Sequence, residues 1–171
     1  MANFPRPQRI TGNTITRPAD TTAYADKDLV ANSATAGSVT PFTFSGVVRN
    51  VGYRAIVRRV GLLASQVLLA NGTFRLHLFT ALPTVTNGDN GALDAASNGS
   101  SYIGWYEVVL SLLATGTGTF GWSSDVASVA QAPASFISVN STSLFGLLEA
   151  KAAYVPASAQ TFTAYLDVDQ Y

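Results

Sequence analysis

The chain of 171 residues contains no cysteine. Disulfide bonds, zinc sites built on thiolates and cysteine nucleophiles are therefore excluded. A chain of this length can bury a full core without such cross-links, and hydrophobic residues make up 47% of it. We therefore expect one globular unit whose stability rests on apolar burial, and the composition leaves its compartment open.

Charged residues are also few. They form 12% of the chain, about half of the usual share, and the formal net charge is zero. A protein without net charge has no long-range repulsion from its own copies or from neighbours, so this composition favours association. No basic cluster is interleaved with aromatic residues, so we expect no nucleic-acid partner.

The few charges are unevenly distributed. Residues 1–80 hold nine basic residues and three acids, and residues 81–171 hold one basic residue and seven acids, which gives formal charges of +6 and −6. Two explanations remain open. Strands from both parts interleave in one sandwich and their charges pair, or the basic surface of one copy contacts the acidic surface of another.

Long apolar runs are absent. No stretch approaches the length that a membrane-spanning helix needs, so we expect no membrane partner. The first residues, MANFPRPQRITGN, have no apolar centre, so we expect no signal peptide.

Residue types that carry catalysis are rare. The chain has one histidine, His77, and two glutamates, Glu107 and Glu149, and all three fall in expected strands. No metalloprotease, nucleophile-elbow, phosphate-loop or dinucleotide-binding motif is present. We expect His77 to be structural and the chain not to be an enzyme, with no catalytic residue and no cofactor.

The segment Thr80–Ser101 is rich in Asn, Asp, Gly and Ser. A loop of this length within a compact domain is unusual and is often functional. Asp89, Asn90 and Asp94 loosely suggest a calcium loop, but the required spacing and the terminal glutamate are missing. We therefore expect no metal site.

The segment Arg54–Phe79 carries the clearest structural pattern. Two apolar runs surround Asn71-Gly72, a pair typical of a two-residue hairpin turn. After the turn, one face of the expected strand carries Phe74, Leu76 and Leu78. We interpret the whole segment as the central hairpin of an antiparallel sandwich.

Further strands are expected along the rest of the chain, at Val39–Asn50, Tyr102–Leu113, Ser135–Val139, Leu144–Val155 and Thr161–Val168. The segment Leu144–Val155 also admits a helix, because Leu, Glu, Ala and Lys favour one. Trp122–Ala132 admits a short helix or a strand with a loop. About eight antiparallel strands joined by Gly, Asn and Pro turns predict an all-β, jelly-roll-like β-sandwich.

Residues 1–25 differ from the rest and are interpreted as an extended N-terminal arm, with the sandwich domain at residues 26–171. Pro5, Pro7 and Pro18 disfavour both a helix and a ladder of backbone hydrogen bonds. Apolar residues within the segment favour an arm that docks on a neighbour over a disordered terminus. We expect a chain without residues 1–25 to fold and to keep its oligomeric state.

The phrases ITRPADTTAYADKDLVANSA, RVGLLASQ, FRLHLFTALPT and YVPASAQTFTAYLDV complete this layout. Together they resemble small virion proteins of tailed bacteriophages, of the capsid decoration (cement) type. The resemblance implies a homotrimer made in the bacterial cytoplasm that binds the major capsid protein on the outer capsid surface and stabilises the shell. From position and chemistry, the residues expected to contact the shell are Phe4, Arg6, Arg9, Ile10 and Arg17.

A second hypothesis is a β-sandwich module of a phage fibre or tail that binds a glycan or a receptor. Trp105, Tyr106 and Trp122 would then form an aromatic platform that stacks on sugar rings. Aromatic residues of a sandwich also serve as core residues, and the sequence alone does not distinguish the two roles.

Overall fold

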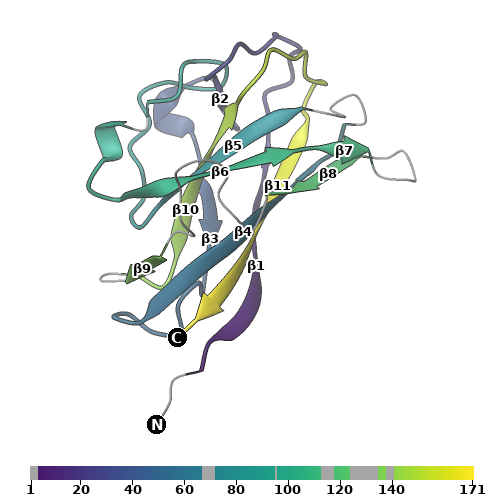
Figure 1. The fold of residues 1–171 in the computed structure, drawn as a ribbon. Coiled ribbons are helices and arrows are strands. Elements are labelled where there is room, and N and C mark those ends of the chain that lie inside the picture. The colour runs from purple at the N-terminus through teal and green to yellow at the C-terminus, as the bar shows by residue number, and fades with distance from the viewer. Residues whose placement is uncertain (1–3, 67–71, 95, 113–117, 124–134, 138–140) are drawn as a thin grey trace.

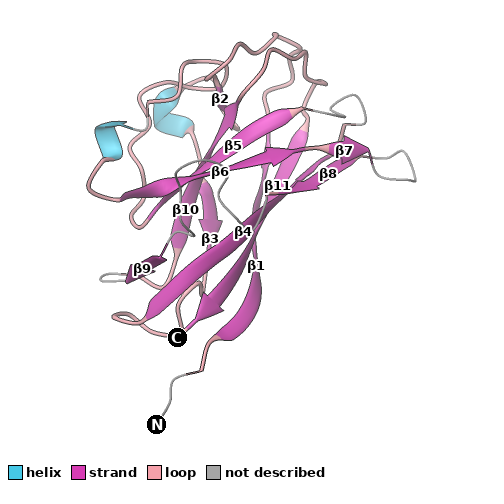
Figure 2. Ribbon diagram, in the orientation of Figure 1, coloured by secondary structure: helices cyan, strands magenta, loops and turns pink. Residues whose placement is uncertain are grey.

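The computed structural model describes residues 4–66, 72–94, 96–112, 118–123, 135–137 and 141–171. Two antiparallel sheets pack face to face (Figures 1 and 2). The six-stranded sheet contains β1 (Arg6–Thr16), β11 (Thr161–Gln170), β4 (Arg54–Ala64), β8 (Thr119–Trp122) and β7 (Ser111–Leu112), with β9 (Ser135–Ile137) beside β4. The five-stranded sheet contains β2 (Leu29–Val30), β10 (Leu144–Ala150), β5 (Thr73–Phe79) and β6 (Tyr102–Val109), with β3 (Phe42–Phe44) beside β10. Two short 3-10 helices, η1 (Ala36–Ser38) and η3 (Ala96–Asn98), lie in loops.

The strand order confirms the predicted jelly-roll-like sandwich. In one sheet the order is β1-β11-β4-β8, and in the other it is β2-β10-β5-β6. The chain therefore changes sheet repeatedly, and its first and last long strands are neighbours. This is the arrangement of two Greek keys wrapped into two sheets.

The expected hairpin at Arg54–Phe79 is wrong. β4 and β5 are both present, but β4 belongs to the six-stranded sheet and β5 to the five-stranded sheet. The turn residue Asn71 lies outside the described residues. A local turn signal cannot distinguish a hairpin within one sheet from a connection between two sheets, because both join two apolar strands through a short polar segment.

The main core lies between the sheets and follows the alternation of the strands. β11 alternates without interruption, so that Phe162, Ala164, Leu166 and Val168 are buried while the residues between them are half-buried. On β5, Phe74, Leu76 and Leu78 enter the same core, as the sequence pattern predicted. A second cluster, on the outer side of the five-stranded sheet, contains Leu29, Ala31, Phe79 and Leu147.

β4 contains a β-bulge, which keeps its apolar side chains directed into the core. Val57 and Val60 are both buried, although they are three residues apart. The pairing with β11 shifts between Asp167 and Val168, where β4 carries one extra residue. A bulge restores the inward alternation and leaves the consecutive residues Arg58 and Arg59 directed to the surface side.

The N-terminal segment forms a strand of the sandwich. β1 pairs with β11 along nearly its whole length, so the expectation that the prolines prevent a backbone ladder is wrong. Pro7 is tolerated because β1 is an edge strand, where alternate N–H groups face away from the sheet. Ile15 and Tyr24 belong to the main core. Removal of residues 1–25 would therefore remove a strand and core side chains, which corrects the expectation that this truncation folds.

The remaining segments resolve one alternative and correct one expectation. Leu144–Ala150 is a strand, because its residues pair with β5 on one side and with β2 and β3 on the other. The expected single strand at Tyr102–Leu113 is divided at Leu110, where the chain passes from β6 in one sheet to β7 in the other. Most of Trp122–Ala132 lies outside the described residues. No helix in the described part of the chain is long and apolar enough to cross a membrane.

Candidate functional site

The outer face of the six-stranded sheet carries ordered rows of side chains across neighbouring strands. In one row Arg9 of β1 lies opposite Asp167 of β11, which lies opposite Arg59 of β4. The next row runs from Tyr165 of β11 across Gly61 of β4 to Trp122 of β8. We call the surface formed by Arg9, Arg59, Phe120, Trp122, Tyr165 and Asp167 the Trp122 face.

Gly61 makes room for the indole ring of Trp122. A Cβ atom at residue 61 would lie 2.8 Å from the ring, closer than such atoms come in proteins. The ring therefore lies over β4. Phe120 contacts it edge-on at a centroid distance of 5.3 Å, and the Tyr165 ring lies 6.5 Å away.

Two arginines connect the aromatic row to Asp167. The guanidinium carbons of Arg9 and Arg59 lie 4.6 Å and 4.4 Å from the centre of the Trp122 ring. Arg9 donates two hydrogen bonds to the carboxylate of Asp167, at 2.8 Å and 3.1 Å, and Arg59 donates one at 2.7 Å. The hydrogen bonds from Arg9, together with the charge of Arg59, hold the pKa of Asp167 below its usual value.

An open groove of about 700 Å³ borders the Trp122 face near the start of β1. It is lined by Pro7, Gln8, Arg9, Arg58, Arg59, Asp167, Val168 and Asp169. Arg58 pairs with Asp169, with Nε 2.7 Å from the carboxylate. The groove thus holds three arginines and two aspartates and has a formal excess of one positive charge.

Four of the five residues expected to contact a shell lie on or beside this part of the sheet. Phe4 is 77% exposed, and Arg6 and Arg9 are exposed on β1. Ile10 is half-buried and packs against the main core. Only part of its surface is therefore available to a partner.

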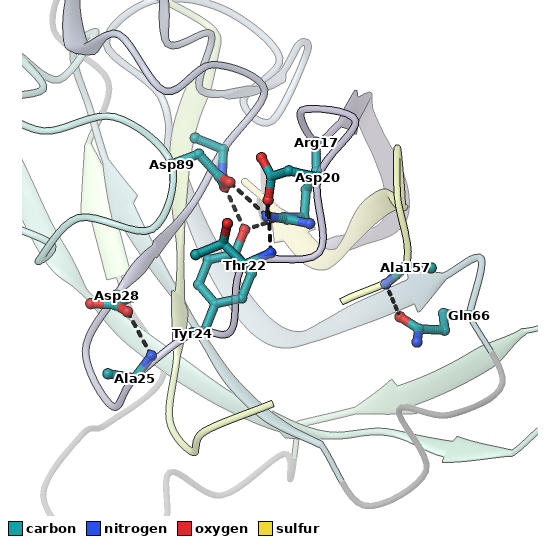
Figure 3. Close-up of polar contacts among 10 residues, drawn as sticks. Arg17, Asp20, Thr22, Tyr24, Ala25, Asp28, Gln66, Asp89 and Ala157 are labelled. Carbon is teal, nitrogen blue, oxygen red and sulfur yellow. Dashed lines mark hydrogen bonds and ion pairs between the residues drawn. The ribbon is translucent and has the colours of Figure 1, made fainter. Parts of the chain in front are cut away.

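Arg17 does not belong to that surface, and its expected contact with a shell is wrong. Its side chain is fully buried and donates a hydrogen bond of 2.8 Å to Asp89 and another to the hydroxyl of Tyr24 (Figure 3). Tyr24 in turn donates to Asp89 at 2.5 Å, and Asp89 also accepts the N–H of Ala31 at 2.7 Å. Burial alone would lower the pKa of Arg17, but Tyr24 and Asp89 raise it above its ordinary value.

This Arg17 cluster gives the long loop a structural role. Asp89 comes from the segment that suggested a calcium loop, and its carboxylate is occupied by Arg17, Tyr24 and Ala31. The described residues contain no group of three or more His, Cys, Asp or Glu side chains placed to hold a metal ion. The loop therefore connects residues 17–31 to the five-stranded sheet.

The three residues of the expected glycan platform do not share one surface. Tyr106 is buried between the sheets, and its hydroxyl donates to the carbonyl of Val57 at 2.7 Å. Trp105 lies on β6 in the five-stranded sheet, where the guanidinium carbon of Arg75 lies 3.9 Å from its ring centre. Trp122 lies on the other sheet, with Arg9 and Arg59 beside its ring. Each tryptophan thus already has an arginine against its ring.

His77 takes part in a polar chain that the sequence did not indicate. Its Nε2 lies 2.8 Å from Glu149, and its Nδ1 lies 3.1 Å from the hydroxyl of Tyr102. Burial, with the charge of Glu149, raises the pKa of Tyr102 to about 12. A raised pKa makes the Tyr102 hydroxyl a poorer nucleophile, so this geometry favours a structural chain.

The uneven charge distribution is explained by pairing between strands of the two parts. Arg9 and Arg59 pair with Asp167, Arg58 with Asp169, and Arg75 with Glu107 at 3.0 Å. These pairs join residues before position 80 to residues after position 106. The interleaved arrangement therefore accounts for much of the +6 and −6 charges.

The comparisons with known proteins give no family. No family model matches the chain, and no curated protein matches its sequence. Similar solved structures include one of Desmodium yellow mottle tymovirus, with a TM-score of 0.29 and 10% identity over 99% of this chain and 89% of that chain. Another holds the CBM22-1 and GH10 modules of xylanase 10B from Clostridium thermocellum with xylohexaose, with a TM-score of 0.27 and 12% identity over 92% of this chain and 26% of that chain. Both TM-scores are too low to support an argument about function.

Proposed function

We propose that this chain is a structural protein of a virus particle that binds the outside of the shell and stabilises it, as a decoration protein does. The observation that carries the proposal is the position of β1. This strand forms an edge of the sandwich, and its first four residues are all exposed. It begins at the end of the sandwich where the C-terminus also lies, so one end of the molecule presents the proposed contact residues (Figure 1).

The chemistry of this end suits attachment to a large protein surface. Phe4 supplies an exposed aromatic ring, and Arg6 and Arg9 supply exposed basic side chains within the same short segment. Aromatic residues and arginine are the residue types most enriched in protein interfaces. The zero net charge of the chain adds no long-range repulsion to close packing on a shell.

The proposal includes a homotrimer. Three copies on one symmetry axis would present three β1 strands to the shell. Linked contacts of this kind raise the overall affinity through effective concentration, although each single contact is weak. Light scattering on a sizing column measures the solution mass, and a monomer would remove the trimer from the proposal.

The test of shell binding uses co-sedimentation with empty shells of the virus that encodes the chain. Deletion of residues 1–5 together with Arg6→Ser removes Phe4 and one charge but keeps nearly all of β1. We expect this variant to fold, with an unchanged unfolding transition, and to lose most of its binding. Leu82→Ser is the matched control, because Leu82 is a similarly exposed apolar residue in a distant loop. Equal binding by the two variants would contradict the proposed contact.

A further inference from the structure

One side of β1 faces away from β11 and pairs with no described strand. A single hydrogen bond shows which backbone N–H and C=O groups of β1 point toward β11 and which point to this free side. The N–H of Arg17 donates to the carbonyl of Gln160 at 2.9 Å, just beyond the pair Thr16–Thr161. In an antiparallel ladder, a bond at this position makes Thr16–Thr161 a non-hydrogen-bonded pair. The N–H of Ser65 on the opposite side donates to the carbonyl of Thr161 at 3.1 Å, so Thr161 directs its backbone groups toward β4.

The same alternation of backbone groups, toward the partner strand and away from it, continues along β1. Between Thr11 and Thr14, β1 advances by three residues while β11 advances by two, so the extra residue belongs to β1 and β11 stays regular. Residues 161, 163, 165, 167 and 169 of β11 therefore all direct their backbone groups toward β4. Their partners Pro7, Arg9 and Thr11 direct their own backbone groups away from the sheet.

This free side forms a window of defined length. It presents the N–H groups of Arg9 and Thr11 and the carbonyls of Pro7, Arg9 and Thr11, and no described strand pairs with β1 there. The Arg9 carbonyl also accepts a long hydrogen bond, 3.4 Å, from the exposed side chain of Gln8, which an added strand would displace. Pro7 limits the window at one end because it has no N–H. At the other end, the side chain of Asn13 accepts the N–H of Thr43 from β3 at 2.6 Å, which connects the second half of β1 to the other sheet.

We propose that this window binds an extended segment of the shell protein, which adds to the six-stranded sheet as a further strand. An exposed edge is a template for this kind of pairing, in which main-chain hydrogen bonds give affinity and alternate side chains give specificity. The proposal rests on the proposed function for the identity of the partner. It assigns the contact to backbone atoms of residues 7–11.

The side chains that border the window define the chemistry of the segment. A residue opposite Arg9 lies beside a guanidinium that uses only Nε and Nη2 for Asp167, so an acidic side chain is favoured there. A residue beside Ile10 reaches the half-buried margin of the core, where an apolar side chain is favoured. The segment therefore alternates acidic and apolar residues. A second copy of β1 does not fit, because β1 carries Arg6 and Arg9 and no acid.

The first experiment uses the whole protein and a synthetic peptide of alternating aspartate and valine. Amide hydrogen exchange is followed by NMR at millimolar peptide. We expect the peptide to slow exchange of the Arg9 and Thr11 amides at least several-fold, and a peptide of alternating lysine and valine to have a much smaller effect. Unchanged exchange at both amides would overturn the proposal.

The second experiment tests the backbone directly. Thr11→Pro removes an N–H that makes no bond to β11, and Thr11→Val is the matched control that keeps this N–H. We expect only the proline variant to lose peptide and shell binding, while both keep the unfolding midpoint within a few degrees. Shell binding that survives Thr11→Pro would overturn the strand addition and leave the proposed function in place. In a third outcome, the unmodified protein binds the peptide but not shells, and Thr11→Pro abolishes peptide binding. This result would support the window and contradict the proposed function.

Discussion

Two arginine–aspartate networks involve the N-terminal segment, and they differ mainly in their contact with water. In the Arg17 cluster, the side chains of Arg17 and Asp89 are 0% and 2% exposed, whereas those of Arg9 and Asp167 on the Trp122 face are 54% and 20% exposed. The shortest nitrogen–oxygen distance is 2.8 Å in both pairs. Equal geometry therefore does not imply equal energy, because the surrounding dielectric sets the strength of each charge interaction.

The difference separates a structural network from one that is available to a partner. When a buried pair loses one member, the other charge remains without water or a counter-charge, and this is strongly destabilising. When an exposed pair loses one member, water solvates the other at little cost. We therefore expect the Arg17 cluster to contribute strongly to holding residues 17–31 on the sandwich, and the Trp122 face to tolerate exchange of partners without unfolding.

The largest effect is expected from removal of the buried carboxylate. Asp89→Ala leaves Arg17 with only the longer contact to the partly exposed Asp20, at 3.5 Å, and leaves Tyr24 without its acceptor. We expect the free energy of unfolding to fall by about 3–5 kcal/mol, measured by urea denaturation. Asp167→Ala is the matched control on the exposed network. A loss of similar size in both variants would contradict the distinction between the networks.

A double replacement sharpens the same comparison. Arg17→Met with Asp89→Leu removes both buried charges, and apolar side chains of similar volume often replace a buried pair without loss. Nη1 of Arg17 has no hydrogen-bond partner among the described residues, so the native pair is incompletely satisfied. We expect the double variant to be more stable than Asp89→Ala alone by at least about 1 kcal/mol. A double variant less stable than the single one would show that Arg17 stabilises the fold even without Asp89, through its contacts with Tyr24 and Asp20.

The fold could be predicted from the sequence to the extent that it depends on alternation. Residues 161–168, predicted as a strand, alternate with a period of two, and their apolar face of Phe162, Ala164, Leu166 and Val168 enters the core. The assignment of strands to sheets could not be predicted, since pairing depends on residues far apart in the chain. Thr163, for example, pairs with Thr14 on one side and Leu63 on the other.

The candidate site was predictable only in part for the same reason. Arg9 was selected from its position in the N-terminal segment, and Trp122 was selected for a different hypothesis. Asp167, which joins Arg9 to Arg59, was not selected, because three strands distant in sequence bring these residues together. The only available signal was the surface position of Asp167 within the alternating pattern of residues 161–168. The burial of Arg17 had no signal, since its partner Asp89 lies 72 residues away.

An intermediate effect is expected at alkaline pH. It arises mainly from Tyr24 of the Arg17 cluster and from Tyr154, whose ring stacks on the Tyr24 ring at a centroid distance of 4.8 Å, and Tyr102 adds to it. Burial raises the pKa values of Tyr24 and Tyr154, so the folded state favours their neutral forms. Their contribution to stability is complete below the unfolded pKa of about 10 and is lost as the pH rises above it, by up to about 1.4 kcal/mol per pH unit for each group. We expect the tyrosinate absorbance of these two residues to appear only on unfolding. Tyr154→Phe should flatten the decline of stability above pH ~10, and an unchanged slope would exclude Tyr154 as a cause.

The smallest effect is expected on the Trp122 face. Asp167→Ala should lower the free energy of unfolding by no more than about 1 kcal/mol, because water solvates Arg9 and Arg59 in its place. Arg9 and Arg59 lower the pKa of Asp167, so its contribution is present above the unfolded pKa of about 3.9 and is lost as the pH falls below it. High salt should weaken the same contribution, whereas the effect of Asp89→Ala should persist because buried charges are poorly screened. Urea denaturation of both variants at low and high salt measures this contrast. An Asp167→Ala effect that is independent of salt would show that the Trp122 face is held by packing of Trp122 on Gly61 more than by its charges.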